Sequence, residues 1–140
     1  MHGTCVKIGE AGVLFRGESG SGKSDLALRL IDQGALLVSD DQVELALSGQ
    51  SIVARAPAPI AGLIEVRGVG LFHLPYRDAP LRLIVDLVAG RPLERLPEIS
   101  YEIVLDASIP RFDLNPWEIS ATAKVRIALR AVSGEVSFLG

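Results

Sequence analysis

Residues 17–24 read Gly-Glu-Ser-Gly-Ser-Gly-Lys-Ser, and they decide how the rest of the chain is interpreted. They match G-x-x-x-x-G-K-[ST], the pattern of the phosphate-binding P-loop. Glycines let the backbone curl so that successive N–H groups point at phosphate oxygens, and the following helix adds its free N–H groups and positive dipole end. Lys23 can reach the β- and γ-phosphates, and the Ser24 hydroxyl can bind Mg²⁺. The stretch therefore predicts a site for ATP and Mg²⁺. Its candidate nucleotide-binding residues are Gly17, Glu18, Ser19, Gly20, Ser21, Gly22, Lys23 and Ser24.

The flanking segments supply the context that a P-loop needs. Residues 12–16 are β-like and residues 25–31 are helix-like, so strand, glycine-rich turn and helix follow one another. A glycine- and serine-rich turn before a helix would explain the composition without any ligand. The four fixed positions and this context together favour nucleotide binding.

Length and composition narrow the class of protein. We expect a single domain over residues 1–140, because this length suffices for one sizeable core. The net charge is −3 and no segment is basic, so the chain lacks the concentrated positive charge that binds nucleic acid or an anionic membrane surface. No signal peptide opens the chain, and no apolar run approaches the roughly 20 residues of a membrane span. The lone Cys5 excludes an internal disulfide and a Cys/His metal cluster, so we expect a cytoplasmic protein.

The apolar pattern predicts a strand-rich α/β fold with two helices. Strands are expected at residues 4–8, 12–15, 36–38, 43–47, 52–54, 63–66, 71–74, 81–88 and 103–105. Hairpins are expected to join the first two of these strands and the fourth to the fifth. Helices are expected at residues 24–33 and 117–132, and residues 91–98 are polar and proline-bounded, hence a loop.

Two adjacent carboxylates, Asp40 and Asp41, directly follow the short strand 36–38, which we expect to run beside the P-loop strand. Beside a phosphate site, one carboxylate can hold Mg²⁺ directly or through water, and the other can accept the proton of an attacking hydroxyl. A polar turn is the structural alternative, but the presence of a P-loop favours the functional interpretation.

Other charged residues carry weaker signals. Glu65 and Arg67 lie two apart on an expected strand and so share a face, where they can offer a carboxylate to the metal and a guanidinium to phosphate. A surface ion pair on a hairpin is the commoner explanation. Arg95, in a loop, and His2, at the terminus, carry no functional signal when each is considered alone.

Taken in chain order, these elements closely resemble the catalytic domain of HPr kinase/phosphorylase. The resemblance rests on His2-Gly3, residues 17–24, Asp40-Asp41, Glu-Val-Arg-Gly-Val-Gly at 65–70, and Glu-Arg-Leu around Arg95, and it covers nearly the whole chain. It implies an ATP-dependent protein kinase that phosphorylates a serine of HPr, the phosphocarrier protein of the bacterial phosphotransferase system. Many members also remove that phosphoryl group with inorganic phosphate. The resemblance further implies a mixed-sheet P-loop fold, a nucleotide site like that of phosphoenolpyruvate carboxykinases, and a homohexamer.

The resemblance also implies roles for individual residues. Asp40 matches the aspartate that accepts the serine proton in the kinase direction and donates a proton in the reverse direction. His2, Lys23 and Arg95 match the other active-site positions, and Ser24 and Glu65 match the magnesium ligands. Asp41 and Arg67 are further candidates.

The chain departs from the family pattern in four places. Because His2-Gly3 stands at the start of the sequence, we expect the usual N-terminal domain to be absent, as in short forms that look like those of alphaproteobacteria. Residues 75–80 are shorter than the mobile loop of the long forms, which closes on the partner protein. Residues 111–123 stand where the family's Gly-Arg-Asn segment, linked to dephosphorylation, is expected, and the C-terminal helix that contacts HPr is curtailed. We therefore expect the kinase direction to be retained and the phosphorylase direction to be weak or missing.

Two other functions stay open. A P-loop kinase or ATPase could act on a small molecule, and a nucleotide sensor could use ATP to change an interaction without transferring a phosphoryl group. Asp40 separates the sensor from the enzymes, because a sensor needs no base beside the γ-phosphate.

Overall fold

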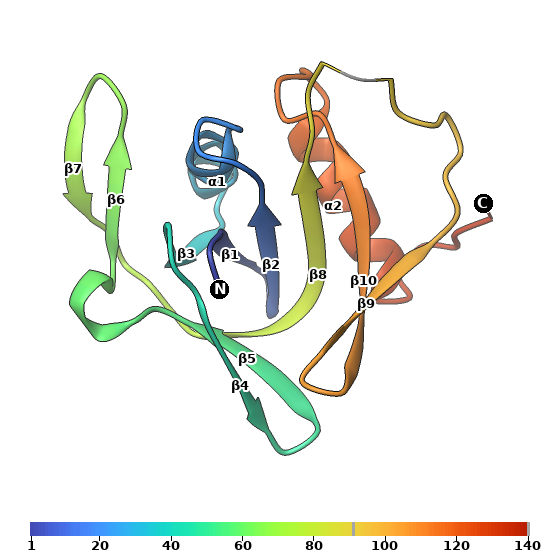
Figure 1. Ribbon diagram of the computed structural model, residues 1–140, viewed down its shortest axis with the longest axis horizontal. Coiled ribbons are helices and arrows are strands. Elements are labelled where there is room, and N and C mark those ends of the chain that lie inside the picture. The colour runs from blue at the N-terminus through green and yellow to red at the C-terminus, as the bar shows by residue number, and fades with distance from the viewer. Residues whose placement is uncertain (91, 140) are drawn as a thin grey trace.

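The structure is a computed structural model that describes residues 1–90 and 92–139. Within these residues, one eight-stranded mixed sheet is accompanied by a separate two-stranded sheet (Figure 1). The strands are β1 (Thr4–Ile8), β2 (Ala11–Arg16), β3 (Leu36–Ser39), β4 (Glu44–Ser48), β5 (Ser51–Arg55), β6 (Leu63–Val66), β7 (Gly70–His73), β8 (Ala79–Leu87), β9 (Ser100–Val104) and β10 (Ala107–Leu114). The helices are α1 (Lys23–Asp32) and α2 (Ala121–Val132), with a short 3-10 turn, η1, at Ala58–Ile60. The expected strand-rich α/β class with a mixed sheet is confirmed.

The order of strands in the main sheet brings four strand ends to one edge. The central path is β3-β1-β2-β8-β10-β9, with the β4–β5 hairpin joined through β5 to β8. β1 is antiparallel to both β2 and β3, whereas β8 is parallel to β2 and β10 is parallel to β8. β3, β2, β8 and β10 therefore run in the same direction, and we call the edge at which they end the carboxyl edge.

The expectation that β3 lies beside the P-loop strand is wrong, because β1 lies between β3 and β2. The hairpin with its tight turn at Gly9 (φ +59°) pairs β1 with one edge of β2, so β3 pairs with the free edge of β1. The direction of β3 is unaffected, and its end still reaches the carboxyl edge.

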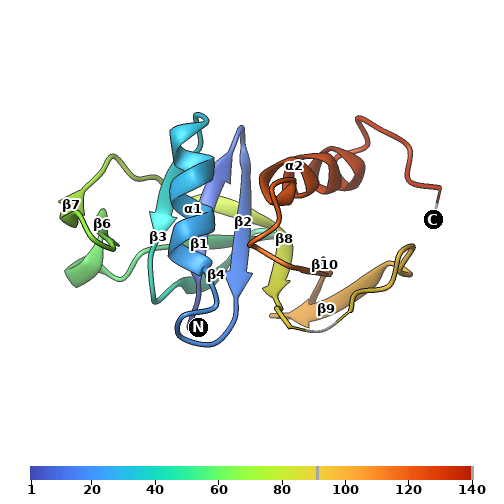
Figure 2. The same ribbon diagram turned by 90° about the horizontal axis from the view of Figure 1, so that it is seen from above.

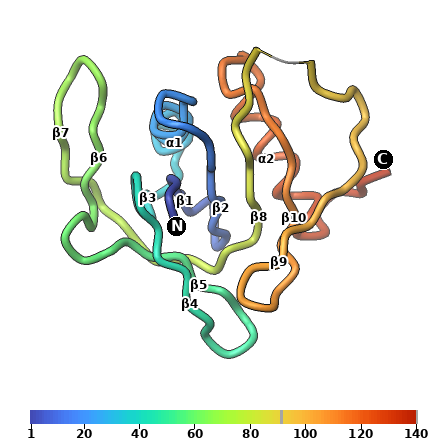
Figure 3. Tube along the Cα trace, viewed as in Figure 1, coloured from blue at the N-terminus to red at the C-terminus, as the bar shows by residue number. Residues whose placement is uncertain are grey.

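Each face of the sheet has its own apolar core. α1 and α2 cover one face, where Leu26, Leu30 and Val125 pack with Phe15 and Val85 (Figure 2). The β4–β5 hairpin covers part of the other face, whose core is centred on buried apolar side chains of β2, β5 and β8. Alternation along a strand explains the division, because neighbouring residues point to opposite faces. The β6–β7 hairpin stands apart from the main sheet, beside α1 (Figure 3).

The chain after β8 differs from expectation in two ways. β10 was not predicted, because Pro110 lacks an N–H and argues against a central strand. Pairing with β8 begins at Arg111, so at Pro110 the strand is paired with β9 alone. α2 begins at Ala121 rather than at residue 117, since residues 116–120 form turns. Residues 92–98 form the expected loop, and Arg91 lies outside the described residues. None of the described helices is long and apolar enough to cross a membrane.

Candidate nucleotide site

The P-loop segment connects the end of β2 to the start of α1, so the strand–loop–helix context of the motif is present. Gly22 occupies the N-cap position of α1 in a left-handed conformation with φ +99°. A Cβ at Gly17 would lie 2.4 Å from Ser21 Oγ, and a Cβ at Gly22 would lie 3.1 Å from the Trp117 ring. Glycine is thus required at both ends of the loop, where the backbone is tightly surrounded.

The loop folds around the ammonium group of Lys23. The Lys23 side chain is buried, and Nζ donates to the carbonyl oxygens of Gly17 at 2.7 Å and Glu18 at 2.8 Å. Ser21 Oγ is also buried, and it has no hydrogen-bond partner among the described residues. A buried hydroxyl of this kind normally has a partner, which an oxygen-rich anion in the loop could supply. The residues present therefore fit a phosphate group.

Asp40 joins the end of β3 to β1 and α1. Its Oδ1 accepts hydrogen bonds from Thr4 Oγ1 and from Ser24 Oγ, each at 2.8 Å. Within the described part of the chain, both bonds that the Asp40 carboxylate accepts end on Oδ1, which leaves Oδ2 available to a ligand. Sequence reasoning missed the fully buried Thr4, although a polar residue at the start of an apolar strand was a usable signal.

Asp41 points away from Asp40 toward the terminus. Its backbone is left-handed (φ +72°), its carbonyl accepts a hydrogen bond from Gly3 N at 2.9 Å, and its Oδ1 lies 3.3 Å from His2 Nε2. The left-handed turn at Asp41 separates the directions of the two carboxylates. The structure thus gathers His2, Lys23, Ser24, Asp40 and Asp41 around the carboxyl edge.

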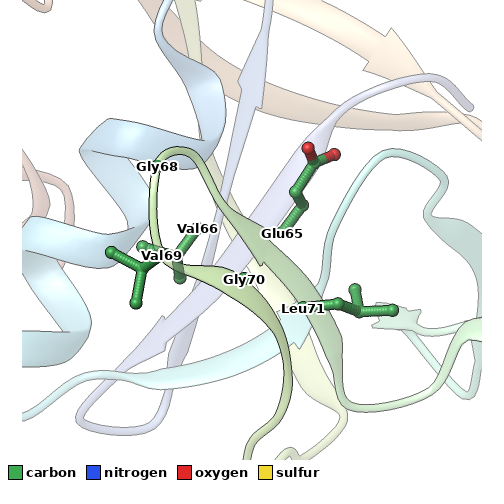
Figure 4. A pocket seen from close by; sticks show the side chains of 6 residues that line it. All are labelled: Glu65, Val66, Gly68, Val69, Gly70 and Leu71. Atoms are coloured by element: carbon green, nitrogen blue, oxygen red, sulfur yellow. The ribbon is translucent and has the colours of Figure 1, made fainter.

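The other predicted site residues are exposed and lie outside this group. Glu65 lies on β6 opposite Leu71, and both line a shallow pocket on the β6–β7 hairpin (Figure 4). β6 ends at Val66, so Arg67 lies in the turn, and the expectation that Glu65 and Arg67 share a strand face is wrong. Arg95 lies in the loop between β8 and β9. Among the described residues, no hydrogen bond or ion pair joins Glu65, Arg67 or Arg95 to the P-loop or Asp40.

A segment that sequence reasoning did not connect with the P-loop packs against it. Pro116 and Trp117 follow β10 and lie next to Gly22, where an added Cβ would come within 3.2 Å of both side chains. The Arg29 side chain on α1 donates to the Pro116 carbonyl at 2.5 Å. Trp117 N donates to Asn115 Oδ1 at 3.1 Å, a local turn that fixes the segment. No pattern of neighbouring residues in the sequence predicts this packing, because the two segments are far apart in the chain.

The available oxygen donors suit a magnesium ion that is completed by phosphates. No group of three or more His, Cys, Asp or Glu side chains that could hold a metal occurs in the described residues. Ser24 Oγ and the Asp40 carboxylate lie together, however, and Mg²⁺ is commonly bound by one or two protein oxygens, substrate phosphates and water. The donor set therefore fits a metal that arrives with a nucleotide.

A second polar group, the charge cluster, lies on the sheet face opposite the helices. It comprises Arg16, Asp86, Glu102, Arg111 and Asp113. Arg16 binds Asp86 at 2.7 Å and Glu102 at 2.5 Å, while Arg111 binds Asp86 at 2.8 Å and also pairs with Asp113. Burial alone would raise the pKa of Asp86, but the hydrogen bonds from Arg16 and Arg111 outweigh it and hold that pKa below its usual value. The hydrogen bonds to Asp86 and Glu102 raise the pKa of Arg16.

Comparison with known proteins gives the same family from sequence and from structure. The family model described as the HPr Serine kinase C-terminal domain matches residues 1–76. The HPr kinase/phosphorylase of Polaromonas sp. (strain JS666) is 42% identical over 112 residues, covering 73% of this chain and 35% of that protein. The HPr kinase/phosphorylase of Caldicellulosiruptor bescii is 49% identical over 74 residues, covering 52% of this chain and 24% of that protein. The chain thus spans about a third or less of the length of these relatives.

A solved structure extends the similarity beyond the matched segment. The Hpr(Ser) kinase/phosphatase from Coxiella burnetii superposes with a TM-score of 0.83 at 27% identity, and 96% of each chain is covered. The similarity therefore includes β8, β10 and α2, which follow the part matched by the family model. With its family match over more than half of the sequence, the chain belongs to the HPr serine kinase C-terminal domain family.

Proposed function

We propose that this chain is an ATP-dependent protein kinase that phosphorylates a serine of an HPr-like phosphocarrier protein of the bacterial phosphotransferase system. The observation that carries the proposal is the hydrogen bond between Ser24 Oγ and Asp40 Oδ1 beside the buried Lys23. This bond supports the proposal because it joins the P-loop segment, the hydroxyl to which we assign Mg²⁺ and the carboxylate to which we assign the role of base. Phosphoryl transfer needs these three parts, because catalysis consists mainly of positioning and charge stabilisation.

In the proposed reaction, the P-loop N–H groups and Lys23 hold the β- and γ-phosphates of ATP. Binding draws the Lys23 ammonium from the carbonyls of Gly17 and Glu18 toward phosphate oxygens. When bound with the nucleotide, Mg²⁺ supplies positive charge to the phosphates. Asp40 accepts the proton of the serine hydroxyl as the new O–P bond forms and the bond from the γ-phosphorus to the bridging oxygen breaks. ADP and phosphoserine are the products.

The resemblance to the family assigns the remaining roles. Ser24 and Glu65 would hold Mg²⁺, His2 and Arg95 would complete the active site, and Arg67 would contact phosphate oxygens. The exposure of Glu65 and Arg95 leaves both side chains accessible to a bound nucleotide or partner. His2 is already paired with Asp41, which supports a positioning role for this pair at the carboxyl edge.

The proposed activity runs mainly in the kinase direction. Phosphorolysis brings phosphate, an anion, to a phosphorylated serine, another anion, and so requires additional positive charge. Residues 111–123 stand where the family's Gly-Arg-Asn segment is expected, and the two cations there or next to it are already paired with carboxylates. Arg111 pairs with Asp86 and Asp113, and Lys124 pairs with Glu118. Supplying phosphorylated HPr with millimolar phosphate and no ATP should therefore release little pyrophosphate. Release as fast as the forward reaction would contradict this part of the proposal.

Transfer of the labelled γ-phosphoryl group from ATP to a panel of HPr proteins tests the proposed activity. We expect label on HPr only when Mg²⁺ is present, and none on a matched HPr in which the acceptor serine is alanine. Label on a small molecule instead would favour the small-molecule kinase. ATP binding without any transfer would favour the nucleotide sensor.

We further propose that the chain is one catalytic domain that assembles into a homo-oligomer, with a hexamer implied by the resemblance. Exposed apolar side chains on the edge strand β9, including Tyr101 and Ile103, supply surface that an assembly could bury. Light scattering at micromolar concentration should give a mass several times 14.9 kDa. A monomer under those conditions would reject the assembly without affecting the nucleotide site.

A further inference from the structure

Trp117 is a large aromatic residue that is incompletely buried next to the P-loop. It is 56% exposed, although its side chain lies next to Gly22 at the start of α1. A Cβ added at Gly22 would lie 3.1 Å from both Cη2 and Cζ2 of the ring. Despite this packing, more than half of the residue remains open to solvent. The contact with Gly22 therefore does not account for the exposed part of the indole.

Trp117 lies on the side of the sheet toward which a nucleotide bound to the P-loop would extend. β2, β8 and β10 are parallel, so the P-loop and the segment after β10 leave the same carboxyl edge (Figure 1). In open α/β sheets, ligands bind outside the carboxyl ends of the strands at the point where the order of connection reverses. Here the chain passes from β2 to β3 on one side, and β8 and β10 lie on the other side of β2. The P-loop marks that point, and Trp117 lies beside it.

The segment that carries Trp117 is held firmly enough to serve as a binding surface. Arg29 Nη2 donates to the Pro116 carbonyl at 2.5 Å, and the same guanidinium binds Asp25 through Nε at 3.1 Å. The Asn115 side chain accepts from Trp117 N, and Glu118 pairs with Lys124 in the first turn of α2. Rigid placement of an aromatic ring lowers the entropic cost of stacking a ligand on it.

We propose that Trp117 is the platform on which the nucleobase of the bound nucleotide stacks. This inference rests on the proposed nucleotide function of the P-loop, and it assigns the base-binding part of that site. An indole with this much exposed surface can stack on a planar base. Removing an aromatic platform of this kind costs about tenfold in affinity or more for each stacked base. Because every base has a π-face, the contribution applies to nucleotides with any base.

The sequence provides a direct probe, because Trp117 is the only tryptophan in the chain. The wild-type chain is titrated with Mg·ATP and, separately, with Mg·tripolyphosphate, which has the phosphates but no base. Tryptophan fluorescence and calorimetry are recorded for both compounds. We expect ATP to change the fluorescence and tripolyphosphate to bind with a much smaller change, because only ATP carries a base that can stack on the ring.

Three variants separate stacking from support of the loop. Trp117→Ala should weaken Mg·ATP binding about tenfold and change Mg·tripolyphosphate binding less than about twofold, while Trp117→Phe should restore most of the ATP affinity. Ile119→Ala, at a fully exposed position in the same segment, is the matched control and should change neither affinity. Circular dichroism of each variant checks that the fold is kept, and Trp117→Phe keeps the test valid if the alanine variant unfolds.

The outcomes separate this inference from the proposed function. An ATP affinity that falls less than twofold in the folded alanine variant, or an equal loss for tripolyphosphate, would overturn the assignment of Trp117 while leaving the P-loop proposal standing. If the wild-type chain binds neither compound, the proposed function fails and the inference fails with it.

Discussion

Two polar regions meet at the junction between Arg16 and Gly17, and they differ in how their groups are satisfied. In the charge cluster, Arg16 and Arg111 are paired with carboxylates from three strands at short distances. In the P-loop, Lys23 is satisfied only by loop carbonyls, and Ser21 Oγ has no partner among the described residues. In the charge cluster the described side chains neutralise one another, whereas the P-loop retains an ammonium group and a hydroxyl that could bind an anion.

This difference shows how a binding site can be distinguished from a structural ion-pair group of similar composition. Both regions contain a basic side chain held by oxygen atoms, which are carboxylate oxygens in the charge cluster and loop carbonyls in the P-loop, and both lie near the carboxyl edge. A completed network holds strands in register, so removing a member should affect stability before binding. A region with an unpartnered buried hydroxyl and a left-handed glycine turn has not been optimised for stability alone.

The largest expected effect is on the catalytic rate, through Asp40. Asp40→Asn keeps the shape of the side chain but removes the proton acceptor, so kcat should fall about 10²- to 10⁴-fold with ATP affinity largely retained. Steady-state transfer to HPr measures it. Asp41→Asn provides the comparison, because asparagine tolerates the left-handed backbone at this position and the Asp41 carboxylate faces His2; its loss of kcat should be much smaller than that of Asp40→Asn. A loss below about threefold in Asp40→Asn would mean that another group is the base.

An intermediate effect is expected on stability, through Asp86. Asp86→Asn leaves Arg16 with Glu102 and Arg111 with Asp113, so the free energy of unfolding should fall by about 1–2 kcal/mol rather than collapse. Urea denaturation measures it. Binding of Mg·ATP should be unchanged. A large loss of ATP affinity in a stable variant would show that the charge cluster belongs to the nucleotide site.

The same carboxylate predicts a pH dependence. Because the pKa of Asp86 is lowered in the folded chain, its stabilising contribution is present above the unfolded pKa of about 3.9 and is lost as the pH falls through the folded value. The difference in unfolding free energy between wild type and Asp86→Asn should therefore shrink as the pH is lowered below about 4. A difference that stays constant over that range would contradict the pairing.

The smallest effect is expected for an isolated exposed pair, Arg55 and Glu44 on the β4–β5 hairpin. Their contact is 3.1 Å, but both side chains are about half exposed. Arg55→Ala should change the free energy of unfolding by less than about 0.5 kcal/mol. Urea denaturation under the same conditions calibrates the Asp86 result. An equal loss at both sites would remove the distinction between a network and a surface pair.

The local parts of this account could be predicted from the sequence. The P-loop lies between a strand and a helix as its flanking residues indicate, and the β1–β2 and β4–β5 hairpins follow from their apolar alternation and glycine turns. These features depend on residues close together in the chain. Ser24 and Asp40 are also brought into contact, because parallel strand ends meet at one edge even though β1 separates β3 from β2.

The parts that could not be predicted depend on register and on long-range packing. The charge cluster draws on four strands, and no local pattern relates Arg16 to Glu102. β10 could not be predicted because a proline such as Pro110 normally indicates a break in a strand. Whether a strand tolerates a proline depends on which neighbouring strand is paired at that position, and here it is β9 alone. Trp117 meets Gly22 only because β10 is parallel to β8 and ends at the same edge. Such contacts require the sheet order before they can be inferred.

Calorimetric titration with ATP, with and without Mg²⁺, tests the central claim most directly when wild type, Lys23→Ala and Asp86→Asn are measured side by side. The account predicts saturable binding of Mg·ATP to the wild type and to Asp86→Asn. Binding should be lost in Lys23→Ala, because this variant lacks the ammonium group that the loop holds. Absence of binding to the wild type, or binding that survives Lys23→Ala but is lost in Asp86→Asn, would contradict it.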